Sequence, residues 1–250
     1  MTTKDEIWEK IGNDINIRKH DFEKEPLQIT AEQIKESTKN SKVKEPRILC
    51  KHDSRESRPK IFQELGLFML PTKNGVYVII KGEGYVNIPE INSEPEVHKS
   101  ILDFVLETSK VGNSEMQHLD FAYASSIIRT FTNDPSLVLT IRGRKYTPEF
   151  SFKVSNYEIS TQSVQTEVDA GYEGKNSIVL VEAKNSKTNN EIIRQLYYPF
   201  RKWEEETSKK VTTLFFEKRG SYFNLWQFDF TDRYNYNSIK FSKSARFKIQ

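Results

Sequence analysis

A short apolar run that ends in two charged residues constrains the fold of this chain more than any other feature of its sequence. Residues 178–181 read Ile-Val-Leu-Val, and Glu182, Ala183 and Lys184 follow directly. An apolar run of this length is typical of a strand that is buried on both faces. Side chains at i and i+2 of a strand share a face, so Glu182 and Lys184 project together. The chain therefore needs a covered sheet whose central strand ends in a carboxylate and an ammonium.

Patterns on both sides of this run predict the elements that surround it. Apolar residues recur at helical spacing in 97–108 and 114–131, and Ser114 is a suitable N-cap for the second helix. Alternation and short apolar runs predict strands at 137–146, 149–154, 160–169, 211–216 and 222–228. We expect the first two of these strands to pair with each other and 171–176 to form a turn. A helix at 191–209, which contains a proline and must bend or divide there, completes the order helix, three strands, helix, strand.

The N-terminal part of the chain carries a separate set of patterns. Helical character is expected at 4–11, 30–39 and 61–67, and a turn at 71–75 leads into a strand at 76–80. Thr30 and Gln33 have the spacing of a capping box. The order helix, turn, strand suits a small winged-helix-like module and equally an ordinary α+β segment. Because residues 88–95 are polar and rich in turn formers, we divide the chain into an N-terminal α+β region (1–93) and a larger domain (94–250).

Composition excludes several classes of protein. The 250 residues carry 38 basic and 35 acidic side chains, and 16 Phe, 11 Tyr and 3 Trp are too many aromatic residues for a disordered chain. No apolar run approaches the roughly 18 residues of a membrane-spanning helix, so we expect no membrane partner. Cys50 is the only cysteine and the four histidines are scattered, so any metal would be held by oxygen ligands. The N-terminus has no apolar signal segment, and a cytoplasmic protein is expected.

The charged end of the central strand has the chemistry of phosphodiester hydrolysis. A hairpin of the length between Asp169 and Glu182 brings these two carboxylates side by side. Carboxylates hold hard divalent cations, which neutralise the charge of a reacting phosphate and generate hydroxide at neutral pH. Lys184 is placed to orient the attacking water, and the carbonyl of Ala183 is a further candidate metal ligand. The alternative is an ion pair at a strand end that has no chemical role.

These residues resemble the active-site motif of the PD-(D/E)XK nuclease superfamily, and the predicted order of elements resembles its common core. Three segments are similar to a group of small prokaryotic type II restriction endonucleases: Gln165-Thr-Glu-Val-Asp-Ala-Gly-Tyr172, Val181-Glu-Ala-Lys184 and Arg194-Gln-Leu-Tyr-Tyr-Pro-Phe-Arg201. Residues 60–71 and 73–77 also resemble that group. Val168, rather than Pro, precedes Asp169, which is common in the superfamily. The resemblance implies an α+β (α/β) chain with a restriction-endonuclease-like core, in which helices flank a mixed central sheet.

Carried over by position, the resemblance assigns roles in a reaction that depends on Mg²⁺, for which Mn²⁺ can substitute. The metal ligands would be Asp169, Glu182 and the carbonyl of Ala183. Lys184 would orient the water. Glu115, in the first turn of the first core helix, is a candidate further acidic residue, although a carboxylate there also favours the helix dipole. Gln195 falls on the helix after the motif, where related nucleases often place a glutamine in the site, and a solvent-facing side chain is the alternative.

Basic residues supply candidate DNA contacts. The stretch 42–60 holds seven basic and three acidic residues, which points weakly to a polyanionic partner. Arg142, Arg144 and Lys145 cluster on a predicted hairpin, where arginine can grip guanine or phosphate, and an exposed basic edge strand is the alternative. Further candidates are Arg194, Arg201 and Lys202 on the helix after the motif, and Arg55, Arg58 and Lys60 in the N-terminal region.

The sequence therefore predicts a type II restriction endonuclease that reads a short site in double-stranded DNA. Such enzymes act as homodimers on palindromic DNA, and a companion DNA methyltransferase would act on the same site. The N-terminal region would serve DNA recognition or dimerisation. Two alternatives stay open, a structure-selective nuclease of the junction-resolvase or repair type and a non-catalytic DNA-binding protein. Retention of Asp169, Glu182 and Lys184 together argues against the second.

Overall fold

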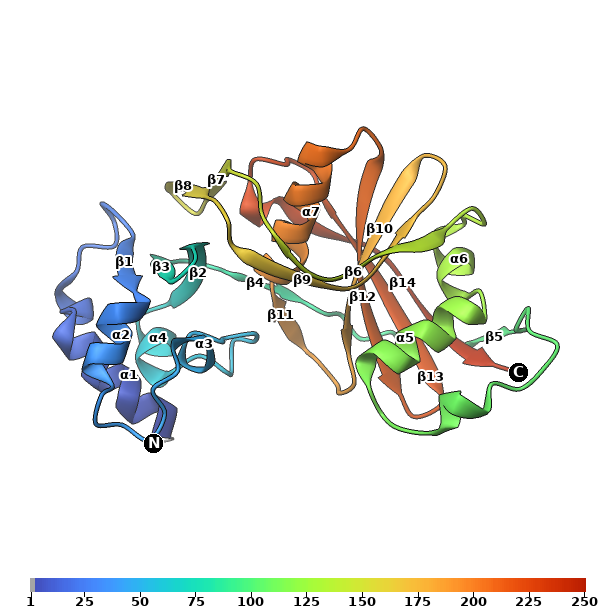
Figure 1. Cartoon of the computed structure of the whole chain (residues 1–250), viewed down its shortest axis with the longest axis horizontal. Helices are drawn as coiled ribbons and strands as arrows, with labels where there is room; N and C mark the ends of the chain where they lie inside the picture. The colour runs from blue at the N-terminus through green and yellow to red at the C-terminus, as the bar shows by residue number, and fades with distance from the viewer. Residues whose placement is uncertain (1–2) are drawn as a thin grey trace.

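The computed structural model describes residues 3–250 and places a seven-stranded mixed sheet in the larger of two lobes (Figure 1). The strand order is β5-β14-β13-β12-β10-β9-β6. These strands are β5 (Glu96–His98), β6 (Val138–Tyr146), β9 (Gln165–Glu173), β10 (Ser177–Lys184), β12 (Lys210–Arg219), β13 (Tyr222–Phe230) and β14 (Ile239–Ile249). β10 lies inside the sheet, antiparallel to β9 and parallel to β12. The prediction of a buried strand at 178–181 is confirmed.

Helices cover both faces of this sheet. They are α5 (Glu115–Ala124), α6 (Ile127–Thr132) and α7 (Arg194–Glu206). α5 and α6 share a buried cluster with Val179 and Val181 of β10, whereas α7 shares another with Ile178 and Leu180. Because side chains alternate along a strand, Glu182 belongs to the face that α7 covers. The expected mixed α+β architecture, a mixed sheet flanked by helices, is therefore confirmed.

Two predicted helices begin or divide differently in the structure. The helix expected at 114–131 starts after the N-cap Ser114, whose side chain accepts a hydrogen bond from Gln117 N–H, as predicted. It divides at Ser126, whose φ of 70° is left-handed and ends the regular helical backbone. The start of the helix expected at 191–209 is instead a short strand, β11 (Asn190–Ile192), and α7 follows it.

The prediction of a helix at 97–108 is wrong. β5 occupies the start of this segment and a 3-10 turn, η2 (Glu107–Lys110), begins near its end. Its apolar residues do not gather on a buried face, since four of them are more than 60% exposed: Val97, Ile101, Phe104 and Val105. Helical spacing of apolar residues yields a helix only where a partner surface buries them.

The strands before β10 also pair differently from the prediction. β6 pairs with β9, and the strand expected to be its partner, β7 (Phe150–Val154), pairs with β8 (Tyr157–Thr161) in a separate hairpin. The strand expected at 160–169 is divided between β8 and β9 near Ser163, whose φ is 56°. β9 continues to Glu173, so the turn expected at 171–176 is shorter.

The N-terminal lobe contains a three-stranded antiparallel sheet in the order β1-β3-β2. Its elements are α1 (Thr3–Asp14), η1 (Ile17–Lys19), β1 (Leu27–Thr30), α2 (Ala31–Ser37), α3 (Pro46–Leu49), α4 (Lys60–Glu64), β2 (Leu67–Lys73) and β3 (Val76–Lys81). The capping box of Thr30 and Gln33 is confirmed. The helix expected at 61–67 ends early, because β2 begins at Leu67 and pairs with β3. A separate buried cluster around Trp8 and Phe62 forms the core of this lobe.

A two-stranded sheet connects the lobes, as Figure 1 shows near its centre. β4 (Tyr85–Asn87) follows the N-terminal sheet and pairs with β11. Two further contacts fix β11, from Ile192 N–H to the Asp53 carbonyl (2.8 Å) and from Arg55 N–H to Asn190 Oδ1 (2.7 Å). A last 3-10 turn, η3 (Tyr236–Ser238), precedes β14. No helix among residues 3–250 is long and apolar enough to cross a membrane.

Candidate active site

Asp169 lies beside β10, near Glu182 and Ala183, at the point where the pairing between β9 and β10 ends. The pairing of these strands ends at Val181 and Ala170. There the register between β6 and β9 shifts, so that two residues of β9, Asp169 and Ala170, oppose one residue of β6. Such a bulge bends a strand and re-aims its side chains. Asp169 is directed at β10, where its Oδ2 accepts a hydrogen bond of 2.7 Å from Ala183 N–H.

The carbonyl of Ala183 points to the side of β10 that faces β9. In a strand, the N–H and C=O of one residue point to the same side, and the N–H of Ala183 meets Asp169. The pairing with β9 has already ended at this position. This orientation is the one that the predicted metal-binding role of Ala183 needs.

Glu182 and Lys184 form an ion pair at the end of β10. Lys184 Nζ lies 2.5 Å from Glu182 Oε1, and the two side chains are 21% and 8% exposed. Gln195, in the first turn of α7, donates to the same Glu182 oxygen across 3.4 Å. Of the two positions considered for Gln195, the structure therefore shows the one inside the site.

Glu115 reaches the same strand end from α5. Its Oε1 accepts a hydrogen bond of 3.2 Å from the backbone N–H of Asn185, the residue after β10. Burial raises the pKa of Asp169, and the nearby Glu115 carboxylate raises it further. Glu115 also occupies the first turn of α5, where the helix dipole favours a negative charge. Glu115 can therefore act as a further acidic residue of the site and also favour the dipole of α5.

Sequence patterns did not identify Glu191, which lies on β11 beside Lys184. Glu191 is 1% exposed, and its Oε2 lies 3.8 Å from Lys184 Nζ. Its Oε1 is buried without a hydrogen-bond partner in the part of the chain that the structure describes. No spacing rule relates position 191 to Glu182, because the loop at 185–189 and the pairing with β4 bring β11 to Lys184.

Burial controls the ionisation of these groups. It raises the pKa of Glu182 to about 7 and that of Glu191 to about 8, although the Lys184 ammonium opposes both shifts. Burial disfavours the charge of Lys184 too, but the carboxylates of Glu182 and Glu191 outweigh it and raise the Lys184 pKa above its usual range. With Asp169 included, the site holds more carboxylates than its ammonium can neutralise. Such an imbalance favours a bound cation.

The raised pKa values predict that the protein without metal loses stability between pH 7 and pH 8.5. Glu182 and Glu191 ionise near pH 4.3 in an unfolded chain but near 7 and 8 in the folded protein. The folded state therefore binds more protons, and its free energy of unfolding falls as the pH rises through the folded pKa values. We expect a loss of about 1–2 kcal/mol, measured by urea unfolding in EDTA. Glu191→Gln should remove most of it, and an unchanged pH dependence in that variant would contradict the assignment.

A cleft of about 320 Å³ runs between the lobes past the site. Gln195 and Arg194 line it from α7, and its basic residues from the N-terminal lobe are Arg47, Lys51 and Lys73. The last three side chains are exposed. Arg47 and Lys51 belong to the basic stretch at 42–60, which was the sequence signal for them. Asp53 and Glu167 also line the cleft, so its four basic residues outnumber its two acidic ones. Such a lining favours a polyanion.

The basic group predicted on β6 is partly engaged with acidic residues. Arg142 pairs with Asp120 of α5, and Arg144 lies 3.4 Å from Glu167. β6 is an edge strand of the central sheet. This position agrees with the alternative to DNA contact, an exposed basic edge strand. Arg144 and Lys145 are exposed, so they remain candidates, whereas Arg142 is held against α5.

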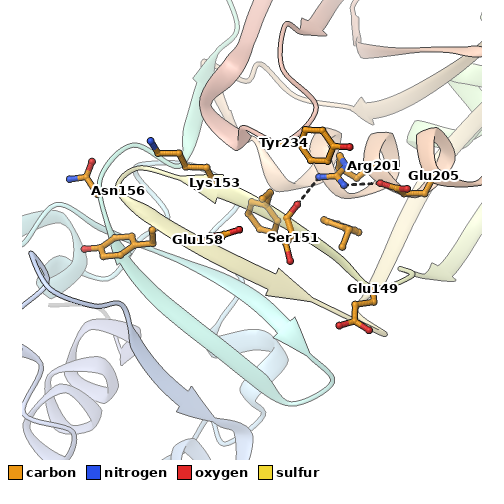
Figure 2. Close-up of a pocket in the computed structure, with 11 residues that line it drawn as sticks. Glu149, Ser151, Lys153, Asn156, Glu158, Arg201, Glu205 and Tyr234 are labelled. Carbon is orange, nitrogen blue, oxygen red and sulfur yellow. Dashed lines mark hydrogen bonds and ion pairs between the residues drawn. The ribbon is translucent and has the colours of Figure 1, made fainter.

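Arg201 and Lys202 are buried in the structure, contrary to their predicted role as DNA contacts. Arg201 is 1% exposed and lines a separate cavity of about 730 Å³, where Figure 2 shows its guanidinium directed at Ser151 and Glu205. It donates to the Ser151 carbonyl (3.1 Å) and to Glu205 (2.8 Å). Lys202 is 9% exposed and pairs with Glu206. These contacts hold the β7–β8 hairpin and α7 together and leave neither residue access to a DNA backbone.

The predicted contacts Arg55 and Arg58 are held within the protein. Arg55 bonds Glu83, Asn87 and the Tyr85 carbonyl. Arg58 bonds the carbonyls of Arg55 and Leu67. Both side chains therefore fix the segment between the lobes. Lys60 is exposed at the start of α4, so it stays a candidate.

Family models match two consecutive parts of the chain. A family model described as a domain of unknown function, DUF6997, matches residues 80–248. The chain belongs to this family. The DUF6997 match contains Glu115, Asp169, Glu182, Lys184, Glu191 and Gln195. A second model, described as the domain of unknown function DUF6996, matches residues 5–79, so the two matches meet within β3. No curated protein and no solved structure matches the chain.

Proposed function

We propose that this DUF6997 protein is a metal-dependent nuclease that hydrolyses phosphodiester bonds of double-stranded DNA at a short specific site, as type II restriction endonucleases do. One observation carries the proposal. Asp169 accepts a hydrogen bond from the N–H of Ala183, between Glu182 and Lys184 on the neighbouring strand, and the Lys184 ammonium lies 2.5 Å from Glu182. Burying this charge costs stability, so a functional reason is needed for its presence.

The order of elements supports the proposal. In the central sheet, α5 and α6 precede three antiparallel strands, β6, β9 and β10, and α7 then leads to β12, which is parallel to β10. The β7–β8 hairpin is inserted between β6 and β9, and β11 lies between β10 and α7. The PD-(D/E)XK superfamily, which the sequence resembles, has the same order of helix, three strands, helix and strand. Asp169 and the motif Glu182-Ala183-Lys184 lie on the second and third of these strands, as the motif requires.

The donor set suits Mg²⁺ or Mn²⁺. These ions prefer oxygen ligands, and Mg²⁺ is commonly held by one or two carboxylates with waters or substrate phosphates completing its shell. Asp169 and Glu182 would hold the ion, with the Ala183 carbonyl as a third oxygen. Among residues 3–250, no group of three or more His, Cys, Asp or Glu side chains is arranged to hold a metal ion. A bound cation would supply charge neutralisation and a hydroxide at neutral pH.

The remaining site residues act on water and phosphate. The Lys184 ammonium, which projects from the same strand face as Glu182, can donate to the attacking water and stabilise negative charge that develops on the phosphate. Gln195 keeps the Glu182 carboxylate in place through its amide. Glu115 anchors the backbone of Asn185 and so fixes the end of β10.

The cleft between the lobes supplies a path for DNA. Arg47, Lys51, Lys73 and Arg194 line it. The order α1, β1, α2, α3, α4, β2, β3 in the N-terminal lobe resembles a winged helix, a module that many DNA-binding proteins share. We therefore assign this lobe to DNA recognition, and a homodimer to cleavage of both strands of a two-fold site.

Digestion of phage DNA tests the proposal. With Mg²⁺ the protein should produce discrete fragments, and with EDTA it should produce none. A smear that grows with time would favour a nonspecific or structure-selective nuclease, which cleavage of branched DNA would then identify. Metal-independent DNA binding without any cleavage would replace the proposal with a non-catalytic DNA-binding function.

A further inference from the structure

Lys184 lies between two buried carboxylates, and the proposed reaction uses only one of them. Glu182 is 2.5 Å from the ammonium and Glu191 is 3.8 Å from it. Glu182 comes from the central sheet, whereas Glu191 comes from the two-stranded sheet that connects the lobes. Two independent parts of the fold thus converge on one side chain.

Within residues 3–250, Lys184 is the one ion-pair partner of the Glu191 side chain. It is 1% exposed, and its Oε1 is buried with no hydrogen-bond partner in the described part of the chain. A buried carboxylate with an unpaired oxygen is destabilising. Its neighbours are different, because Asn190 bonds Glu56 and Ile192 bonds the Asp53 carbonyl. These contacts hold the backbone of β11 and leave the Glu191 side chain directed at Lys184.

The geometry points to Glu191 as the positioning residue of Lys184. A cation bound to Glu182 would compete with the Lys184 ammonium for that carboxylate. Glu191 then supplies a second carboxylate, within ion-pair distance, that keeps the ammonium at the end of β10. This inference rests on the proposed nuclease function, and it assigns Glu191 to Lys184 rather than to the metal.

The isosteric variant Glu191→Gln tests the inference. Loss of a supporting carboxylate typically lowers activity about 10–100-fold. We expect that loss in kcat, with KM for DNA and calorimetric affinity for Mn²⁺ unchanged. Glu191→Asp should restore part of kcat because it keeps the charge. Glu205→Gln, which alters a carboxylate paired with the buried Arg201, serves as the matched control and should keep full activity.

A second measurement does not depend on cleavage. An amine-specific reagent should label Lys184 faster in Glu191→Gln than in the wild type when Mn²⁺ is present, as read by mass spectrometry. Equal labelling would overturn the inference, and so would a loss of Mn²⁺ affinity in Glu191→Gln, which would make Glu191 a metal ligand. If the wild type cuts no DNA, the nuclease proposal fails, and the labelling comparison still decides whether Glu191 holds Lys184.

Discussion

Lys184→Ala is expected to lower the rate of DNA cleavage by about 10³-fold. The variant removes the ammonium that contacts the buried Glu182, and with it the donor that would face water and phosphate. The fold should persist, because burial already raises the pKa of Glu182 and Glu191, and loss of the ammonium that opposes both shifts makes it easier for the two carboxylates to take up protons. Cleavage of supercoiled plasmid with Mg²⁺ measures the rate, and circular dichroism checks the fold.

Lys209→Ala is the matched control for this prediction. Lys209 forms an ion pair with Glu173, the last residue of β9. It is 31% exposed, which is close to the exposure of Lys184. Removal of Lys209 should leave cleavage unchanged. Equal cleavage by Lys184→Ala and the wild type would overturn the assignment of the site.

The centre of the fold was predictable because its signals are local. The apolar run at 178–181 has no polar face, so only a doubly covered strand satisfies it. The alternation of strand side chains then places Glu182 and Lys184 on one face, whatever surrounds them. To predict the position of Asp169, one further inference was needed, that β9 and β10 form an antiparallel hairpin. In the structure Glu182 and Lys184 form an ion pair, and Asp169 accepts a hydrogen bond from the N–H of Ala183 between them.

The wrong predictions concern residues whose neighbours in the structure belong to distant parts of the chain. The sequence predicts that a helix starts at Glu191. The strand β11 forms there instead, because β4 pairs with it from about a hundred residues earlier in the chain. Arg201 reads as an exposed basic residue on a helix, but the β7–β8 hairpin covers it and supplies the Ser151 carbonyl. The segment at 97–108 has helical spacing without a surface to bury it. Local periodicity carries no information about such partners.

Asp169→Asn should abolish metal binding while making the metal-free protein more stable at pH 8. Asparagine has nearly the same shape, and its Oδ1 can still accept the hydrogen bond from Ala183 N–H. The variant lacks the charge that a divalent cation needs. We therefore expect a loss of cleavage of about 10³-fold and no rise in Tm when Mg²⁺ is added.

The gain in stability follows from the sign of the pKa shift. Burial raises the pKa of Asp169, and the Glu115 and Glu167 carboxylates raise it further, so ionisation is harder in the folded state than in the unfolded one. The stability that this group contributes is present below its unfolded pKa and is lost as the pH rises through its folded pKa. Asparagine does not ionise, so thermal unfolding in EDTA at pH 8 should occur at a higher temperature.

Asp134→Asn is the control with the opposite sign, because hydrogen bonds from Ser136 and Ser177 lower the pKa of Asp134. That variant should unfold at a lower temperature and still cut DNA, whereas a lower Tm for Asp169→Asn would show that Asp169 serves the fold rather than the metal.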